Sequence, residues 1–193
     1  MKDVMLDFET LGNGENKCLC QVGAVFFDSS TGELGAEFKA NIDAGSHVKR
    51  GGLIDANTTY WWLQQSDAAR ASILAEPRED VFEVMTRLNA FLKPATRIWS
   101  HATFDFVTLM ETLRKLGIKP EFSYKAGYDL RTLTYLGHVT ADGFTREGTH
   151  HDALDDCKYQ VKYAVAALTS VKTNRQAINF LTKLTDRDRS KDG

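Results

Sequence analysis

Val4-Met5-Leu6-Asp7-Phe8-Glu9 is the stretch of sequence that decides both the fold and the chemistry of this chain. Side chains alternate between the two faces of a strand, so Asp7 and Glu9 share one face. Leu6 and Phe8 point to the other face. Two neighbouring carboxylates on an apolar strand repel each other and lose hydration, and a bound divalent cation would offset that cost. The alternative is an edge strand with a solvated acidic face.

The segments that follow predict an antiparallel meander. Residues 19–28 and 34–42 are two further apolar strands, and the turn at 29–32 separates them. Strand, turn and strand in this order are typical of neighbouring antiparallel strands. Short strands are also expected over 97–100 and near Tyr124.

Helices are expected to alternate with the later strands. Apolar spacing and helix-forming composition predict them over 58–74, 79–92, 103–116, 152–171 and 174–184, and Asp129 is the expected N-cap of another. The sequence therefore predicts an α/β fold whose mixed five-stranded sheet is flanked by helices. We expect one domain over residues 1–185 and a frayed polar tail over 186–193.

The net charge limits how this chain could bind nucleic acid. Lys and Arg total 24 while Asp and Glu total 26, which gives a net charge of −2. Proteins that coat duplex nucleic acid are usually strongly basic. Contact with nucleic acid would therefore be local, in a groove or through bound metal ions.

Length and cysteine content further restrict the class of protein to which this chain could belong. The 193 residues favour a single domain, and three cysteines are too few for a disulfide scaffold. A reducing cytoplasm is the expected location. No stretch approaches the roughly 20 apolar residues that span a bilayer, so no membrane partner is expected.

Two more acidic clusters lie far along the chain. Phe104-Asp105-Phe106 begins one predicted helix, and the run from His150 to Asp156, HHDALDD, enters another. Each cluster alone could simply cap its helix or complement the helix dipole. In the second cluster the residues leave open whether His150 or His151 is a base. They also leave open which Asp is a ligand, because Asp155 and Asp156 flank the apolar stripe about equally.

Together the clusters resemble the DEDDh group of 3′–5′ exonucleases. The matching motifs are the D-x-E of Asp7 and Glu9, the F-D pair ending at Asp105, and the H-x4-D of His151 and Asp156. Their order and spread over residues 7–156 cover most of the chain. The resemblance implies a ribonuclease-H-like fold and phosphodiester hydrolysis from a 3′ end.

The resemblance also assigns roles to residues. Asp7, Glu9, Asp105 and Asp156 would hold two divalent cations, Mg²⁺ or Mn²⁺, whose preferred ligands are carboxylate oxygens. His151, selected by the family register, would be the general base. Asp152 is assigned to the helix N-terminus and His150 is expected to be exposed. The substrate-binding candidates are Thr10, Leu11, Phe104 and Trp61.

A tryptophan segment narrows the resemblance to a subgroup. The stretch TTYWWLQQSDAARASIL, residues 58–74, is similar to one in the subgroup of exoribonuclease AS, phage exonuclease A and, more distantly, exonuclease VIII. Trp61 and Trp62 could pack in the core, or one could stack on a base. Members trim RNA or DNA, so single-stranded RNA is slightly favoured and a phage-type DNA exonuclease is the alternative. A homodimer is possible, with residues 43–57 at its interface.

Two other functions fit these residues less well. A binding module of the same fold, which holds a nucleic-acid end without cleaving it, would be expected to lack one of the acids, and none is missing. A small phosphoester hydrolase on an unrelated α/β fold would leave the paired tryptophans and the H-x4-D register unexplained.

Overall fold

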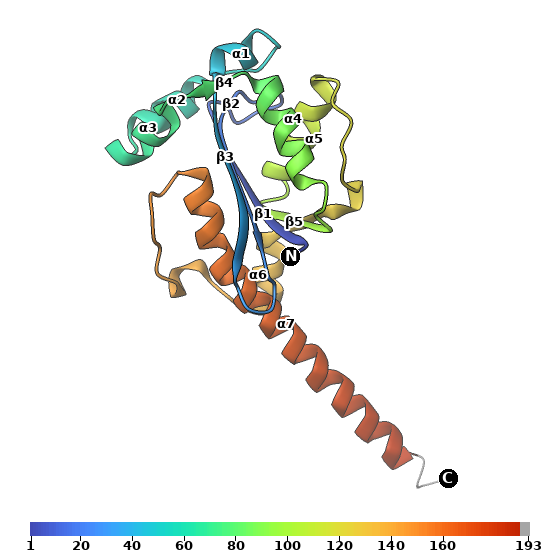
Figure 1. Ribbon diagram of the computed structural model, residues 1–193. Coiled ribbons are helices and arrows are strands. Elements are labelled where there is room, and N and C mark those ends of the chain that lie inside the picture. Colours follow the sequence, from blue (N-terminus) through green and yellow to red (C-terminus); the bar gives the residue numbers. More distant parts are fainter. Residues whose placement is uncertain (190–193) are drawn as a thin grey trace.

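A six-stranded sheet forms the centre of the molecule (Figure 1). The computed structural model describes the backbone of residues 1–189 and the side chains of residues 1–176. The strands lie in the order β4-β3-β2-β1-β5-β6. Their bounds are β1 (Asp3–Thr10), β2 (Leu19–Phe27), β3 (Leu34–Ile42), β4 (Arg78–Glu79), β5 (Arg97–Ser100) and β6 (Gly127–Asp129). The first three strands form the predicted antiparallel meander, and each later strand is parallel to its neighbour.

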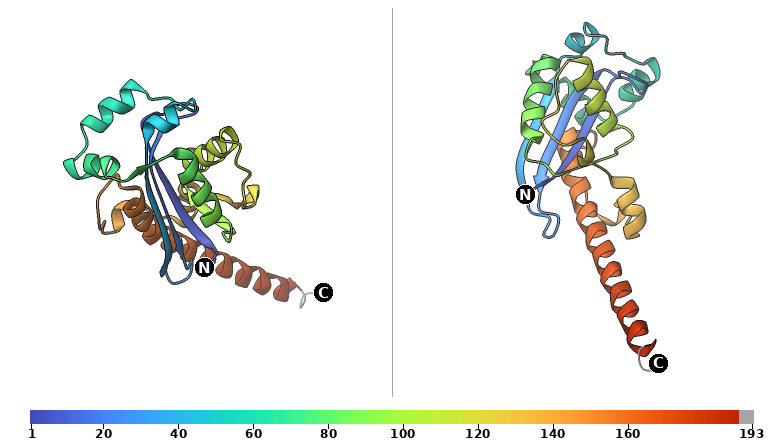
Figure 2. Two further views of the ribbon diagram at one scale, coloured as in Figure 1. Left: turned by 45° about the horizontal axis from the view of Figure 1, so that its top comes forward. Right: turned by 90° about the vertical axis from the view of Figure 1, so that its right-hand side faces the viewer.

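Helices cover both faces of the sheet (Figure 2). The α-helices are α1 (Ala44–Val48), α2 (Ala56–Leu63), α3 (Asp67–Leu74), α4 (Val81–Leu92), α5 (Asp105–Lys115), α6 (Leu130–Gly137) and α7 (Ala153–Arg189), with 3₁₀ turns η1 (Tyr124–Ala126) and η2 (Ala141–Gly143). Helices α4 and α5 bury one face, and α6 and α7 bury the other. The predicted α/β architecture is confirmed.

The pleat of β1 directs its acids toward α7. Leu6 and Phe8 pack into the core beneath α4 and α5, whereas Met5 packs into the core beneath α6 and α7. Because strand side chains alternate, Asp7 and Glu9 lie on the same face as Met5. The predicted separation of apolar and acidic faces is therefore confirmed.

A close contact places the start of α7 directly over this acidic face. Gly23 of β2 pairs with Asp7, and a Cβ atom at Gly23 would lie 2.3 Å from the carbonyl carbon of Ala153. The Ala153 backbone N–H donates to Oε1 of the fully buried Gln21 at 2.7 Å. A glycine thus lets the helix approach the sheet, and a buried amide fixes its first turn.

The sheet contains one strand more than the five expected. Strand β4 has only two residues, Arg78–Glu79, which is too short for any periodicity to show in the sequence. The strand expected near Tyr124 begins at Gly127, after a 3₁₀ turn. Residues 43–57, for which no helix or strand is expected from the sequence, contain the short helix α1 and the first two residues of α2.

Three helix predictions were also wrong in their extent. The 58–74 segment is divided into α2 and α3, because Ser66 caps α3 through a bond from the Ala69 N–H to its hydroxyl. The helices expected over 152–171 and 174–184 are a single helix, α7. The described part of the expected tail, residues 186–189, is helical, and residues 190–193 lie outside the described chain.

Hydropathy of the helices bears on membrane insertion. Among the helices in the described part of the chain, none combines the length and apolar character needed to cross a bilayer.

Candidate active site

Three carboxylates gather where β1 faces the first turn of α7. Oxygen atoms of Asp7, Glu9 and Asp156 all lie within 4.8 Å of one another. All three residues are buried. The strand period brings the first two together, and the close approach of α7 to β2 adds the third.

Asp105 joins this group from the start of α5. Its Oδ1 accepts the Phe8 backbone N–H at 3.2 Å, and its Oδ2 accepts the His101 backbone N–H at 3.1 Å. Both bonds orient the carboxylate beside the ends of β1 and β5. Burial nevertheless raises the pKa of Asp105 to about 7.

Burial and mutual repulsion both disfavour the ionised forms of these carboxylates. Burial, followed by the charges of neighbouring carboxylates, raises the pKa values of Asp7 and Glu9 well above their usual range. Burial also raises the pKa of Asp156, although the Arg146 guanidinium opposes this. Ionised carboxylates packed this closely are unfavourable unless positive charge lies among them.

His151 lies at the entrance to α7 in a restrained conformation. Its φ of 64° is in the left-handed region, which is uncommon for residues other than glycine. Its ring lies edge-on to Trp61, with centroids 4.8 Å apart, and its backbone N–H donates to Oδ2 of Asp156 at 3.3 Å. Burial, then the charges of His150 and Arg146, lowers the pKa of His151 to about 4. The imidazole is therefore neutral at neutral pH.

The four carboxylates and His151 line a cavity of about 490 Å³. Polar side chains outside the sequence motifs also line it, among them His101, Arg131, Arg146 and Gln160. Gln160 donates to Oδ1 of Asp7 at 2.9 Å, and it could have been found because it follows Asp156 by one helical turn. Arg146 forms an ion pair with Asp156 and stacks over Tyr159, 4.0 Å from its ring centroid. Arg146 belongs to an irregular segment, so no periodicity points to it. No motif in the sequence points to His101.

The site has the chemistry of a divalent-cation site. Its ligand set is rich in carboxylates, which suits Mg²⁺ or Mn²⁺ rather than a closed zinc site. In the described part of the chain, three buried side-chain atoms have no hydrogen-bond partner: Ser100 Oγ, His101 Nδ1 and Gln160 Oε1. His101 and Gln160 line the carboxylate cavity. Unpaired polar atoms beside repelling acids fit hydrated cations.

A second cavity of about 700 Å³ continues from Glu9 toward α2, and Thr10, Trp61 and Phe104 are among the residues that line it. Trp61 is 41% exposed, whereas Trp62 is buried and donates its indole N–H to the Thr10 carbonyl at 2.9 Å. Leu11 packs against the cluster that contains Trp62. The structure thus brings three of the four substrate-binding candidates to one hollow, whereas Leu11 is not among the residues that line it.

Several polar residues and one cysteine outside the carboxylate cluster have structural or exposed positions. Asp152 caps α7, with its Oδ1 accepting the backbone N–H groups of Leu154 and Asp155 at 3.2 Å. His150 is exposed, as expected. His47 is structural, because its Nδ1 accepts the Leu19 N–H at 3.0 Å. Cys157 is buried in the core.

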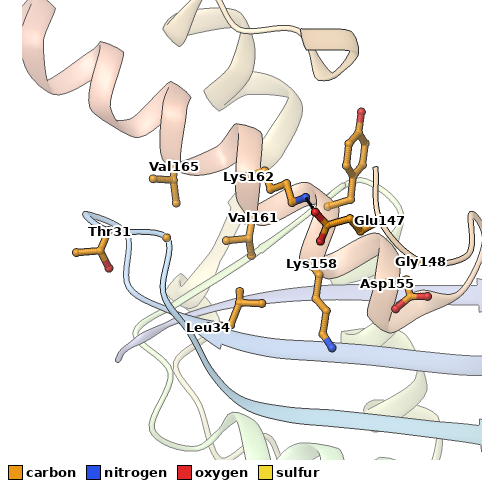
Figure 3. Close-up of a pocket in the computed structure, with 11 residues that line it drawn as sticks. Thr31, Leu34, Glu147, Gly148, Asp155, Lys158, Val161, Lys162 and Val165 are labelled. Atoms are coloured by element: carbon orange, nitrogen blue, oxygen red, sulfur yellow. Dashed lines mark ion pairs between the residues drawn. The ribbon is translucent and has the colours of Figure 1, made fainter. Parts of the chain in front are cut away.

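The segment that leads to the histidines is anchored on α7. A cavity of about 390 Å³ separates the β2–β3 turn from α7, and Glu147 and Gly148 form part of its wall (Figure 3). There Lys162 pairs with Glu147 at 3.3 Å. Two helical turns earlier, Asp155 Oδ2 accepts the Thr149 N–H at 2.7 Å. These bonds fix the position of the chain just before His150.

Comparison with known proteins agrees with this geometry. The exodeoxyribonuclease of Enterobacteria phage T4 is 27% identical to this chain, over an alignment that covers 86% of this chain and 91% of that protein. The nuclease domain of 3′hExo, a DEDDh family member solved with rAMP, superposes with a TM-score of 0.58 at 16% identity, over 86% of this chain and 91% of that one. E. coli exonuclease I, solved with a dT13 oligonucleotide, has a TM-score of 0.57 at 17% identity, over 96% of this chain and 44% of that one.

Fold, site and similarity together define a DEDDh-type 3′–5′ exonuclease of the ribonuclease-H-like fold, an enzyme that hydrolyses phosphodiester bonds. More particularly, the chain belongs to the family of the 3′–5′ exoribonuclease Rv2179c-like domain, whose model matches residues 2–168. The class expected from the sequence motifs is confirmed.

Proposed function

We propose that this enzyme removes nucleotides from the 3′ end of single-stranded nucleic acid, with RNA slightly favoured, by a mechanism that uses two divalent cations and a histidine base. The observation that carries the proposal is the buried group formed by Asp7, Glu9 and Asp156, whose oxygens lie within 4.8 Å of one another. Asp105 stands beside them, and His151 lies at the rim.

Asp7, Glu9, Asp105 and Asp156 would hold the cations, Mg²⁺ or Mn²⁺. When bound, the two ions neutralise the phosphodiester and stabilise the leaving 3′ oxygen. The protein contributes rigid ligand positions: Gln160 orients Asp7, and two backbone N–H groups orient Asp105.

His151 would accept the proton of the attacking water. Its low pKa keeps the imidazole in the neutral form that can accept a proton. Its backbone bond to Asp156 and its contact with Trp61 hold the ring beside the carboxylates.

The hollow beside Glu9 would receive the terminal nucleotide. Trp61 and Phe104 offer aromatic surface for a base or sugar, and Thr10 lies at the end of β1 next to the acids. Leu11 would support this wall through its contact with the cluster that contains Trp62. A pocket that closes beyond the reacting bond would favour cleavage at chain ends over internal cleavage.

The preference for RNA rests on relatives and not on a contact with the sugar. The family description names exoribonucleases, and 3′hExo was solved with rAMP, whereas the T4 relative is an exodeoxyribonuclease. The alternative substrate is therefore DNA. A 2′-hydroxyl contact would distinguish the two.

Four oligonucleotides that differ only in their sugars would test the substrate preference. Two are all ribose or all deoxyribose; in the other two, only the 3′-terminal nucleotide carries the opposite sugar. We expect faster removal whenever the last sugar is ribose. Equal rates on all four would contradict the preference for RNA. A 3′-phosphate version should resist cleavage, and cutting inside it would contradict the end specificity.

Two further expectations from the sequence remain proposals. Light scattering of the purified chain would test the homodimer. Location in the cytoplasm fits cysteines that are free and buried. A non-cleaving binding module would be favoured only if metal stabilised the folded chain without any hydrolysis.

A further inference from the structure

A second group of possible metal ligands overlaps the edge of the carboxylate cluster. One ligand atom from each of His150, His151 and Asp156 lies within 4.8 Å of the other two. The imidazole rings of the two histidines are stacked, with centroids 3.8 Å apart and planes 20° from parallel. This group differs from the all-carboxylate set because nitrogen supplies two of its three ligands.

Ligand chemistry separates the two groups. Imidazole nitrogen suits Zn²⁺, Co²⁺ and Ni²⁺, whereas Mg²⁺ prefers oxygen and keeps its water. Two histidines and one carboxylate, with a fourth position open to solvent, form a common zinc ligand set. The histidine group therefore selects a metal that the carboxylates do not prefer.

The surroundings make this group accessible and partly preorganised. His150 is exposed, so its ring can rotate toward an arriving ion. His151 is held by its left-handed backbone and by Trp61. Arg146 opposes binding, since its guanidinium is paired with Asp156 and must move away from that carboxylate.

We propose that His150, His151 and Asp156 form an inhibitory site for a transition-metal ion, Zn²⁺ above all. An ion there would occupy the nitrogen of His151 that accepts the proton and would draw Asp156 away from the catalytic cations. The inhibitory part of this inference rests on the proposed function; the binding part does not.

The binding part can be tested with Co²⁺, which replaces Zn²⁺ and absorbs visible light strongly in a four-coordinate site. The wild-type chain would be titrated with Co²⁺ in excess Mg²⁺ beside His150→Phe, which keeps a stacked ring but removes the ligand. His150→Gln would check the result without the ring, and His138→Asn would control for loss of an exposed histidine elsewhere.

We expect the strong absorption in wild type and in His138→Asn, and its loss in both His150 variants. Absence of the band in wild type, or its persistence in His150→Phe and His150→Gln, would overturn the site.

The inhibitory part can be tested by adding Zn²⁺ to the nuclease reaction in excess Mg²⁺. Half-inhibition of His150→Phe should require at least about tenfold more Zn²⁺ than wild type, the scale of loss seen when metal-site residues are removed. Activity without Zn²⁺ should match wild type. Equal inhibition of both proteins would overturn the inhibitory role. If wild type showed no activity in Mg²⁺, the proposed function would fail, and the Co²⁺ spectrum alone would decide the site.

Discussion

At the scale of the residue, Asp7 should destabilise the protein when no cation is bound. Its carboxylate is buried among like charges. Burial is the larger cause of its raised pKa, and the neighbouring carboxylates raise it further. Asp7→Asn removes the charge and keeps an acceptor for Gln160. In the presence of a chelator at pH 7.5, we expect the variant to melt at a higher temperature than wild type. Each kcal/mol of added stability should raise the melting temperature by about 2–4 °C. Added Mn²⁺ should stabilise wild type and leave the variant nearly unchanged.

The same residue predicts a pH dependence. A carboxyl whose pKa is higher in the folded than in the unfolded chain binds more protons when folded. The metal-free fold therefore loses stability as pH rises from the pKa of Asp in the unfolded chain, about 3.9, toward the higher pKa of Asp7 in the folded chain. Melting curves in chelator between about pH 4 and 8 should show wild type falling progressively below Asp7→Asn. A constant difference between the two proteins would contradict a raised pKa for Asp7.

His151 should affect the chemical step more than binding. If it accepts a proton from water, His151→Ala should lower kcat about 10²–10⁴-fold. Affinity for an oligonucleotide, measured in Ca²⁺ by fluorescence anisotropy, should change little. His150→Ala serves as the neighbouring control and should retain its activity. A loss confined to affinity would instead make His151 a substrate contact.

Part of the site could be predicted from single residues and part could not. The strand period alone placed Asp7 and Glu9 on one face, because alternation is a local property. The family register was needed to prefer Asp156 over Asp155, since both flank the apolar stripe of the helix. Arg146 reaches the cluster from an irregular segment, and its position depends on how that segment packs against α7.

At the scale of the element, the seating of α7 on β2 should be critical. A Cβ at Gly23 would overlap the backbone of Ala153, whereas a Cβ at Gly143 would meet nothing within 4 Å. Gly23→Ala should cost about 1–3 kcal/mol, as overpacked sites do, and should displace Asp156 from Asp7. We expect at least about a tenfold loss of kcat/KM, because small displacements of reacting groups are costly.

Gly143→Ala is the matched control, and it should leave both stability and activity near wild type. Chemical denaturation and initial rates would measure the two effects. Normal activity in a Gly23→Ala chain would show that the close approach of α7 does not set the site.

Elements with strong periodicity were predictable, and short or coupled ones were not. The 34–42 strand was predicted with its observed bounds. Strand β4 forms because its two residues pair with the end of β3, which is a long-range contact. The expected break in α7 near residue 172 does not occur, although Val171 is the last of the described side chains (residues 1–176) to pack in the core beneath α6 and α7.

At the scale of the whole molecule, α7 extends well past the sheet that it covers (Figures 1 and 2). Its contacts with the core include residues as far as Val171, and the family match ends at residue 168. Deleting residues 177–193 should therefore change kcat/KM by no more than about twofold, which corresponds to roughly 0.5 kcal/mol. Light scattering of both chains would show whether this extension takes part in the proposed homodimer. A large loss of activity in a folded truncated monomer would contradict this division of the chain.

Metal-dependent cleavage of a labelled strand tests the central claim most directly. Single-stranded RNA and the matching DNA, each labelled at the 5′ end, would be incubated with the protein in Mg²⁺, in Mn²⁺ and in EDTA. Asp7→Asn would be run beside wild type, with circular dichroism to show that both are folded. We predict a ladder that shortens from the 3′ end, requires metal, is lost in Asp7→Asn and proceeds faster on RNA. Cleavage that persists in EDTA or in Asp7→Asn, or no cleavage of either strand by the folded wild-type protein, would contradict it.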